Sequence, residues 1–431
     1  MIPILRSSDK KSLNRLLGQR RTSLEEALRV AGTILADIRR NGDRALARLS
    51  RRLDGIDLRR QGYEVRRAEI ERAYRAVSKD FLRALPVAAR SIRQVAKRQL
   101  PNSWQIRTWP GVMVGQTVRP LDRIACYIPG GRFPLPSTVL MSVIPAQIAG
   151  VREILVTSPR PAPSVLVATD WLGIKNVYRL GGAQAIAAFA YGTERVPRVD
   201  KIVGPGNRYV AAAKKLLAGE VSIDFVAGPT ELMVVGGQGD PEWIAADLVA
   251  QAEHDPEAVA LLVTPSRRLA LEVQAVAARL LEELFPTDSE VGRQSLDRRG
   301  GILLTRDLEE AVEIANAFAP EHLTLLDGAT RFVGMIRSAG SIFLGGMSPV
   351  AAGDYASGSN HVLPTAGAAR LRGGLSAADF VKTISFQRLT SGGLRRLRPA
   401  IVALATAEGL KAHARSVETR FKVHDRATQS D

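Results

Sequence analysis

The sequence has little cysteine and few aromatic residues: Cys126 is its only cysteine, and aromatics make up 5% of 431 residues. A single cysteine excludes an internal disulfide, and we therefore expect a cytoplasmic protein. No apolar run approaches the roughly 18 residues that span a membrane. The first residues, MIPILRSSDKK, lack the apolar core of a signal peptide. The sequence predicts no membrane association.

Motifs for nucleic-acid binding are also missing, although the net charge is +17. There is no zinc-finger spacing, no aromatic RNA-binding motif and no basic-zipper heptad. The basic excess is concentrated in residues 1–100, which hold 25 Lys/Arg against 11 Asp/Glu. These basic residues are interleaved with apolar positions at helical spacing. We therefore interpret them as a solvated surface rather than a nucleic-acid interface.

What the chain does have is length and a regular alternation of elements. The first 100 residues show helical spacing of apolar side chains. From Leu121 onward, β-rich runs alternate with helical segments, and three such units in a row begin with residues 153–159, 176–182 and 200–207. Successive βα units predict parallel strands with right-handed crossovers. A second series begins near residue 241, and ligands of such sheets bind beyond the carboxyl ends of the strands.

We therefore expect an α/β fold with two consecutive doubly wound, Rossmann-like domains and helical N-terminal and C-terminal extensions. The predicted division has four parts: an N-terminal extension (1–22), a larger domain (23–122 and 235–375), a smaller domain (123–234) and a helical C-terminal tail (376–431).

An ionisable pair, Glu321 and His322, stands in the apolar stretch FAPEHLTLL at residues 318–326. Burying a carboxylate and an imidazole without partners is costly. A predicted strand follows directly, so the pair lies in the turn between a helix and that strand. Histidine is the commonest general base, and a neighbouring carboxylate can handle a second proton. We favour a catalytic pair over a partly exposed turn.

Candidate metal ligands are few, because the chain has only five histidines. Gln251 and His254 are three residues apart on a predicted helix and so share one face. Asp354 lies in a glycine-rich loop directly after a strand. Such nitrogen and oxygen donors suit Zn²⁺. A capped helix end and a hydrogen-bonded loop would explain the same residues equally well.

Glycine-rich turns follow three of the predicted strands, at residues 129–131, 181–182 and 204–207. Glycines in such places let backbone N–H groups approach phosphates. None of the turns matches the dinucleotide fingerprint G-x-G-x-x-G. Ordinary turn geometry explains them as well as a nucleotide site does.

Seven segments, in this order, resemble the histidinol dehydrogenase family: CYIPGGRFPLPSTVLMSVIPAQIAG, GGAQAIAAFAYGT, VDKIVGPGN, FVAGPTE, DLVAQAEHDP, APEHLTLL and GDYASGSNHVLPT. The resemblance covers most of the chain. It implies an NAD-dependent, zinc-dependent oxidation of L-histidinol to L-histidine through bound L-histidinaldehyde, at the end of histidine biosynthesis. It also implies a homodimer with intertwined tails and shared active sites.

The same resemblance implies roles for individual residues. His322 would be the general base, and Glu321 would activate water. Four residues would bind zinc and contact the substrate: Gln251, His254, Asp354 and His413. Further substrate contacts would come from Thr230, His322, His361 and Glu408. The NAD contacts would be Tyr127, Gln184 and Asn207. Glu408 and His413 would reach into the site of the partner subunit.

Two alternatives stay open beside this interpretation. Thr230 stands where the family usually has serine, so a related enzyme for another small amino or sulfonated alcohol is the nearest alternative. A nucleic-acid-binding protein that has kept the fold is the other, and the intact set of site residues argues against it. The family reaction does not explain the basic first 100 residues. We expect Cys126 not to be a nucleophile, since no histidine adjoins it in the sequence to lower its pKa.

Overall fold

The computed structural model describes residues 2–11, 14, 18, 24–131, 133–287 and 290–427, without the side chains of residues 422–427. Residues 12–13, 15–17 and 19–22 of the predicted N-terminal extension therefore lie outside the described residues. The chain divides into two compact units. The first comprises Met1–Gln99 and Leu121–Phe380, and the second comprises Leu100–Pro120 and Val381–Asp431. In the described part of the chain, no helix is both long and apolar enough to cross a membrane.

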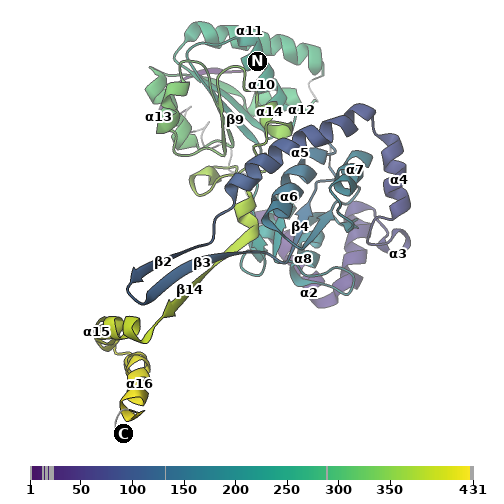
Figure 1. The fold of residues 1–431 in the computed structure, drawn as a ribbon. Helices are drawn as coiled ribbons and strands as arrows, with labels where there is room; N and C mark the ends of the chain where they lie inside the picture. The colour runs from purple at the N-terminus through teal and green to yellow at the C-terminus, as the bar shows by residue number, and fades with distance from the viewer. Residues whose placement is uncertain are drawn as a thin grey trace. The chain divides into compact units, whose positions relative to one another are not determined.

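The first sheet of the first unit has five parallel strands in the order β6-β5-β4-β7-β8. Its central strand, β4, is labelled in Figure 1. Its strands are β4 (Arg123–Tyr127), β5 (Glu153–Thr157), β6 (Val177–Tyr178), β7 (Lys201–Val203) and β8 (Ser222–Ile223). Most of their side chains are buried, as expected of parallel strands covered on both faces. The chain adds strands first on one side of β4 and then on the other. The topological switch point therefore lies between β4 and β7.

Four helices connect these strands: α6 (Pro136–Ala149), α7 (Pro163–Trp171), α8 (Gly182–Tyr191) and α9 (Arg208–Leu217). Both α6 and α7 begin with proline, whose missing N–H and fixed φ suit the first helical position. Asn207 caps α9, and its side chain accepts hydrogen bonds from the backbone of Tyr209 and Val210. The predicted βα units of this region are confirmed.

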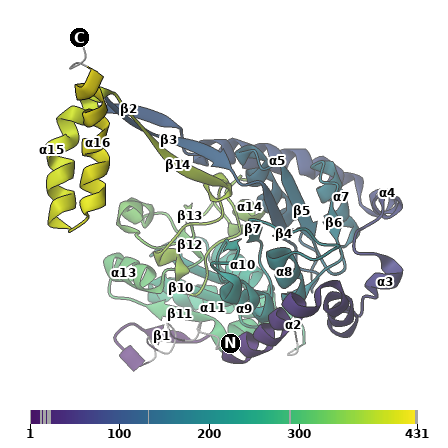
Figure 2. The ribbon, with the colours of Figure 1, turned by 90° about the horizontal axis from the view of Figure 1, so that it is seen from below.

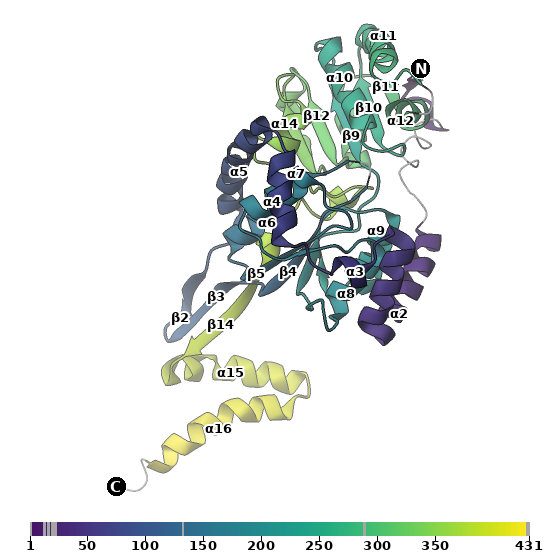
Figure 3. The same cartoon turned by 90° about the vertical axis from the view of Figure 1, so that its right-hand side faces the viewer.

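Residues 25–99 form helices that cover this first sheet: α2 (Glu25–Leu49), the π-helical turn η1 (Ser50–Asp54), α3 (Leu58–Gln61), α4 (Arg67–Ala76) and α5 (Lys79–Gln99). Helix α2 packs on α8 and α9, α4 packs on α7, and α5 packs on α6 (Figure 3). Leu35 shares a core with Phe189, and Ile92 shares another with Ile144. The predicted grouping of residues 23–122 with the second sheet is therefore wrong for these helices, because their apolar faces are buried against the helices that connect the strands of the first sheet.

The second sheet has six parallel strands in the order β1-β11-β10-β9-β12-β13. They are β1 (Ile4–Arg6), β9 (Glu231–Val235), β10 (Val259–Thr264), β11 (Gly301–Leu304), β12 (His322–Leu325) and β13 (Ser341–Leu344). The central strands β9, β10 and β12 are buried along their whole length. Here the switch point lies between β9 and β12. The predicted α/β fold with two parallel sheets is confirmed.

The elements between these strands complete the first unit: α10 (Pro241–Ala252), α11 (Arg267–Leu284), α12 (Val291–Arg299), α13 (Leu308–Phe318), α14 (Val350–Tyr355) and the 3₁₀ turns η2 (Thr330–Met335), η3 (Ala368–Arg370) and η4 (Ala377–Phe380). Asp240 caps α10 and Asp307 caps α13 through side chains that accept backbone N–H groups. In a parallel sheet the connecting helix returns toward the amino ends of the strands. The carboxyl end of α10 therefore approaches the start of β9 and β12.

The second unit is a three-stranded antiparallel sheet followed by two helices. Its strands are β2 (Trp104–Trp109), β3 (Val112–Pro120) and β14 (Val381–Leu389), in the order β14-β3-β2. Helices α15 (Ser391–Ala407) and α16 (Lys411–Ala427) pack on each other (Figure 2). The prediction of an all-helical tail over 376–431 is wrong at β14. This strand is mostly exposed, so it carries no burial pattern, and its partner lies far away in the sequence.

Candidate active site

The pair Glu321–His322 joins α13 to β12. Helix α13 ends at Phe318. Its C-cap, Ala319, adopts a left-handed conformation with φ 53°, and Pro320 prevents the helix from continuing. His322 is the first residue of β12. The side chains of Glu321 and His322 are 8% and 6% exposed. The pair is thus buried in the turn predicted for it, and the alternative of a partly exposed turn is wrong.

This location corrects one expectation about the second sheet. Glu321 and His322 lie at the amino end of β12, and Thr230 directly precedes β9. The site therefore forms at the amino edge of the strands, whereas the rule for open α/β sheets places ligands at the carboxyl edge. The reason is that α10, α13 and α14 bring polar residues to this side. Asp354 lies in α14, so its predicted position in a loop is wrong.

Glu321 is held by a chain of hydrogen bonds. Its Oε2 accepts from the hydroxyl of Thr230 at 2.5 Å and from the backbone N of Glu231 at 2.9 Å. The amide Nε2 of Gln251 donates to the same Thr230 hydroxyl at 2.6 Å. Burial raises the pKa of Glu321, and the neighbouring His322 and these donors oppose the rise. The carboxylate is therefore fixed in place by donors that favour its charged form.

In the described structure, one ring nitrogen of His322 forms a hydrogen bond and the other does not. Its Nδ1 lies 3.0 Å from the carbonyl oxygen of Glu231 and donates to it. Its Nε2 is buried and has no hydrogen-bond partner among the described residues. This Nε2 lies 3.7 Å from Oδ1 of Asp354. Burial lowers the pKa of His322, but the carboxylates of Glu321 and Asp354 outweigh it and raise that pKa to about 9.

Asp354, on α14, interacts electrostatically with three histidines. Burial raises the pKa of Asp354, but His322, His361 and His254 together hold it below its usual value. His361 donates from Nδ1 to the backbone carbonyl of Asp354 at 2.9 Å. Its Nε2 lies 3.1 Å from the hydroxyl of Thr138, which donates to it. Burial also lowers the pKa of His361 and so favours its neutral form.

The predicted metal ligands of the first unit are Gln251, His254 and Asp354. Gln251 is buried on α10, His254 follows that helix and is exposed, and Asp354 faces the same group of histidines. Among the described residues, no three His, Cys, Asp or Glu side chains are arranged to hold a metal ion. The candidate set here has two such side chains, His254 and Asp354, and the amide of Gln251. Because its Nε2 donates to Thr230, its Oε1 is the atom left for a cation.

Two predicted site residues lie in the second unit. Glu408 is the C-cap of α15, and His413 lies in the first turn of α16. Both are exposed. Their roles stay predictions.

The predicted cofactor contacts lie at the carboxyl edge of the first sheet. Tyr127 ends β4, and its hydroxyl accepts from the backbone N of Gly182 at 3.2 Å. Gln184, in the first turn of α8, donates from Nε2 to Asp54 at 2.8 Å, while its Oε1 is buried without a partner in the described structure. Asn207 caps α9 across the switch point. An unpaired buried acceptor at this edge fits a ligand that donates a hydrogen bond.

Residues that the sequence analysis missed also contribute to these sites. Thr138 contacts His361, which is 223 residues away in the sequence, and no local sequence pattern predicts such a pair. Asp54, at the end of η1, orients Gln184. Cys126, by contrast, is fully buried in β4, and burial raises its pKa far above the usual range. A buried neutral thiol is a poor nucleophile, as expected for Cys126.

Comparison with known proteins shows which family the chain resembles. A family model of histidinol dehydrogenase matches residues 17–421. The histidinol dehydrogenase of Methanothermobacter thermautotrophicus is 47% identical over 422 residues, covering 96% of this chain and 98% of that protein. The enzyme of Rhizobium meliloti is 44% identical over 425 residues, covering 97% and 98%. The crystal structure of histidinol dehydrogenase from Elizabethkingia anophelis matches with a TM-score of 0.93 and 35% identity, covering 98% and 99%.

Proposed function

Because the chain belongs to the histidinol dehydrogenase family, we propose that it oxidises L-histidinol to L-histidine in a four-electron reaction with NAD⁺. The observation that carries the proposal is the buried pair at the start of β12. The Nε2 of His322 has no hydrogen-bond partner in the described part of the chain, and Glu321 beside it is held by Thr230 and a backbone N–H. Two proton-transfer groups at one place suit an alcohol oxidation followed by hydration of an aldehyde.

We infer that Gln251, His254 and Asp354 would hold a zinc ion, together with His413. Their amide, imidazole and carboxylate donors suit that ion, and His254 and Asp354 already interact electrostatically. When bound, Zn²⁺ would hold and orient the substrate, and its charge would favour the neutral form of His322 that a base requires.

In the proposed reaction, His322 takes the hydroxyl proton of histidinol at Nε2 while a hydride leaves the alcohol carbon for NAD⁺. Glu321 then removes a proton from a water molecule, which attacks the resulting aldehyde. His322 takes the proton of the hydrate as the second hydride leaves. His361, kept neutral by burial and fixed by Thr138 and the Asp354 carbonyl, can contact the substrate in one defined orientation.

The NAD⁺ contacts are proposed at Tyr127, Gln184 and Asn207. Their support is the switch point between β4 and β7 and the unpaired Oε1 of Gln184. The proposed homodimer is supported by exposed apolar side chains on the second unit. They are Trp104, Ile106, Trp109, Ile384 and Leu404, and a second copy of the chain would remove them from water.

One assay tests the function. Purified protein with Zn²⁺ and NAD⁺ is offered L-histidinol and a panel of other small amino and sulfonated alcohols. The expected result is two NADH per histidinol, with histidine as the product and the panel turned over far more slowly. Preference for a panel member would replace histidinol as the proposed substrate. A loss of activity on zinc removal, with recovery when zinc is restored, tests the metal.

A further inference from the structure

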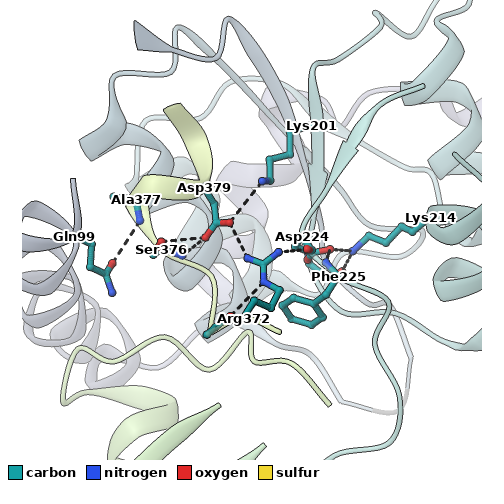
Figure 4. A network of polar contacts seen from close by, with 11 residues as sticks. Gln99, Lys201, Lys214, Asp224, Phe225, Arg372, Ser376, Ala377 and Asp379 are labelled. Atoms are coloured by element: carbon teal, nitrogen blue, oxygen red, sulfur yellow. Dashed lines mark hydrogen bonds and ion pairs between the residues drawn. The ribbon is translucent and has the colours of Figure 1, made fainter. Parts of the chain in front are cut away.

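A buried ion pair holds the turn that connects β7 to α9, at residues 204–207. Asp224 directly follows β8, and Lys214 lies on α9. The Nζ of Lys214 is 2.6 Å from Oδ1 of Asp224 (Figure 4), and the two side chains are only 3% and 1% exposed. The pair is thus almost completely removed from water, among elements that meet at the carboxyl edge of the first sheet.

Both members of the pair contact the backbone of Gly204. Its N–H donates to Oδ2 of Asp224 at 2.7 Å. Its carbonyl oxygen accepts from Nζ of Lys214 at 2.6 Å. Asp224 also accepts from the backbone N of Phe225 at 2.7 Å. The two polar groups of one turn residue are therefore fixed from two different elements.

No residue with a side chain fits at position 204. Its φ is +112°, and a Cβ built on it would collide with the carbonyl oxygen of Tyr127. The turn therefore passes directly against the end of β4, at the switch point of the sheet. Beyond the turn, Asn207 uses its Oδ1 to accept from Tyr209 and Val210, which leaves its Nδ2 as the group able to donate to a ligand.

Stability alone does not account for a buried ion pair in this place. The free-energy cost of desolvating two charges commonly exceeds the gain from their attraction. Apolar residues of the same volume often give the folded protein the same stability. What apolar residues cannot do is hold the N–H and the carbonyl oxygen of Gly204 at once. The specific contribution of Lys214 and Asp224 is therefore the geometry of the turn.

We propose that Lys214 and Asp224 are positioning residues for the cofactor: by fixing Gly204 they set the place of Asn207 and thereby the affinity for NAD⁺. The inference rests on the proposed function, which places NAD⁺ at this edge of the sheet. Neither residue would touch the reacting atoms. Their effect would pass through the turn to the bound dinucleotide.

The same network supplies a matched control in Lys201. This lysine lies on β7, three residues before Gly204, and is also buried. Its Nζ is 3.7 Å from Oδ1 of Asp379, which Arg372 and Ser376 also contact (Figure 4). No hydrogen bond joins the Lys201 side chain to the turn in the described structure. Lys201→Met therefore removes a buried charge from the network without removing a contact to Gly204.

The experiment compares full-length Lys214→Met and Lys201→Met with the wild type. Affinity for NAD⁺ is measured by calorimetry without substrate, KM is measured separately for NAD⁺ and histidinol, and the melting temperature is recorded. Lys214→Met should raise the NAD⁺ Kd by about tenfold or more, which corresponds to at least 1.4 kcal/mol. The KM for histidinol should stay within about twofold of the wild-type value, because neither residue is proposed to contact the substrate. Lys201→Met should lower the melting temperature and leave the NAD⁺ Kd unchanged.

A second variant keeps the test decisive if Lys214→Met does not fold. Asp224→Asn retains an oxygen for the Gly204 N–H but loses the charge that holds Lys214, so it should weaken NAD⁺ binding in the same direction. An unchanged NAD⁺ Kd in a folded variant, or an equal rise in Lys201→Met, would overturn the proposal. A wild type that binds NAD⁺ but ignores histidinol refutes only the proposed substrate. A wild type that binds no NAD⁺ overturns both.

Discussion

Glu321 and His322 occupy neighbouring positions but have different partners. The carboxylate accepts from Thr230 and from a backbone N–H, so it is held in one orientation. The imidazole donates from Nδ1 to the Glu231 carbonyl and keeps Nε2 unpaired. This asymmetry supports the proposed division of roles, in which the imidazole abstracts protons from the substrate and the carboxylate activates water. The residue types predicted the pair, and only the resemblance to the family divided its roles.

The division of roles predicts unequal losses. Glu321→Gln keeps an oxygen that can accept from Thr230, so the first hydride step should survive while hydration slows by about a hundredfold or more. The variant should release close to one NADH per histidinol in a fast phase and then nearly stop. His322→Asn should slow both phases. Stopped-flow absorbance of NADH measures them, and equal slowing by both substitutions would show that the residues act as one unit.

Cys126 is buried in β4 at the edge where NAD⁺ is proposed to bind, so its substitution needs a separate prediction. Burial raises its pKa, and the neutral thiol is not nucleophilic. Cys126→Ala should therefore keep most of the activity and lower the melting temperature slightly, because the core loses a sulfur atom. Steady-state kinetics check this. A drop of about a thousandfold, some 4 kcal/mol in the barrier, would contradict it.

At the scale of elements, helix α6 links the first sheet to the histidine group around Asp354. Thr138, in its first turn, donates to Nε2 of His361, whose Nδ1 donates to the Asp354 carbonyl. The hydroxyl therefore fixes both the tautomer and the ring orientation of His361. A helix that packs on the proposed cofactor sheet thus contributes to the proposed substrate site.

This contact can be tested with one pair of substitutions. Thr138→Val keeps the shape but leaves Nε2 of His361 without a donor, and an unsatisfied buried group costs about 1–3 kcal/mol. The KM for histidinol should rise about tenfold, while the KM for NAD⁺ stays the same. Thr138→Ser restores the hydroxyl and should restore the KM. A uniform loss of stability with unchanged KM values would mean that Thr138 only supports the fold.

At the scale of the whole molecule, the sequence predicted what is local and missed what is distant. The βα units that contain Tyr127, Gln184 and Asn207 were predicted because burial on both faces leaves continuous apolar runs. The placement of α2 to α5 on the first sheet was missed, since an amphipathic helix does not specify which apolar surface it covers. The pairing of β14 with β3 was missed because β14 is mostly exposed and β3 is only partly buried, so neither strand has a clear burial pattern. The contact of Thr138 with His361 depends on the two sheets meeting.

The last prediction concerns Glu408 and His413, which the second unit carries on α15 and α16. If the proposed homodimer shares its active sites, each site takes the catalytic pair from one subunit and His413 from the other. His322→Asn and His413→Asn homodimers should both be inactive. After subunit exchange, a hybrid dimer has one site with both defects and one site with none. A random mixture is about half hybrid, and half of the sites in each hybrid are intact. Activity should therefore return to about a quarter of the wild-type value. Native mass spectrometry confirms the exchange. A mixture of His322→Asn with Glu321→Gln is the matched control: each site takes both of these residues from one subunit, so every site of the hybrid keeps one defect. Confirmed hybrids without activity would show that each subunit builds its site alone.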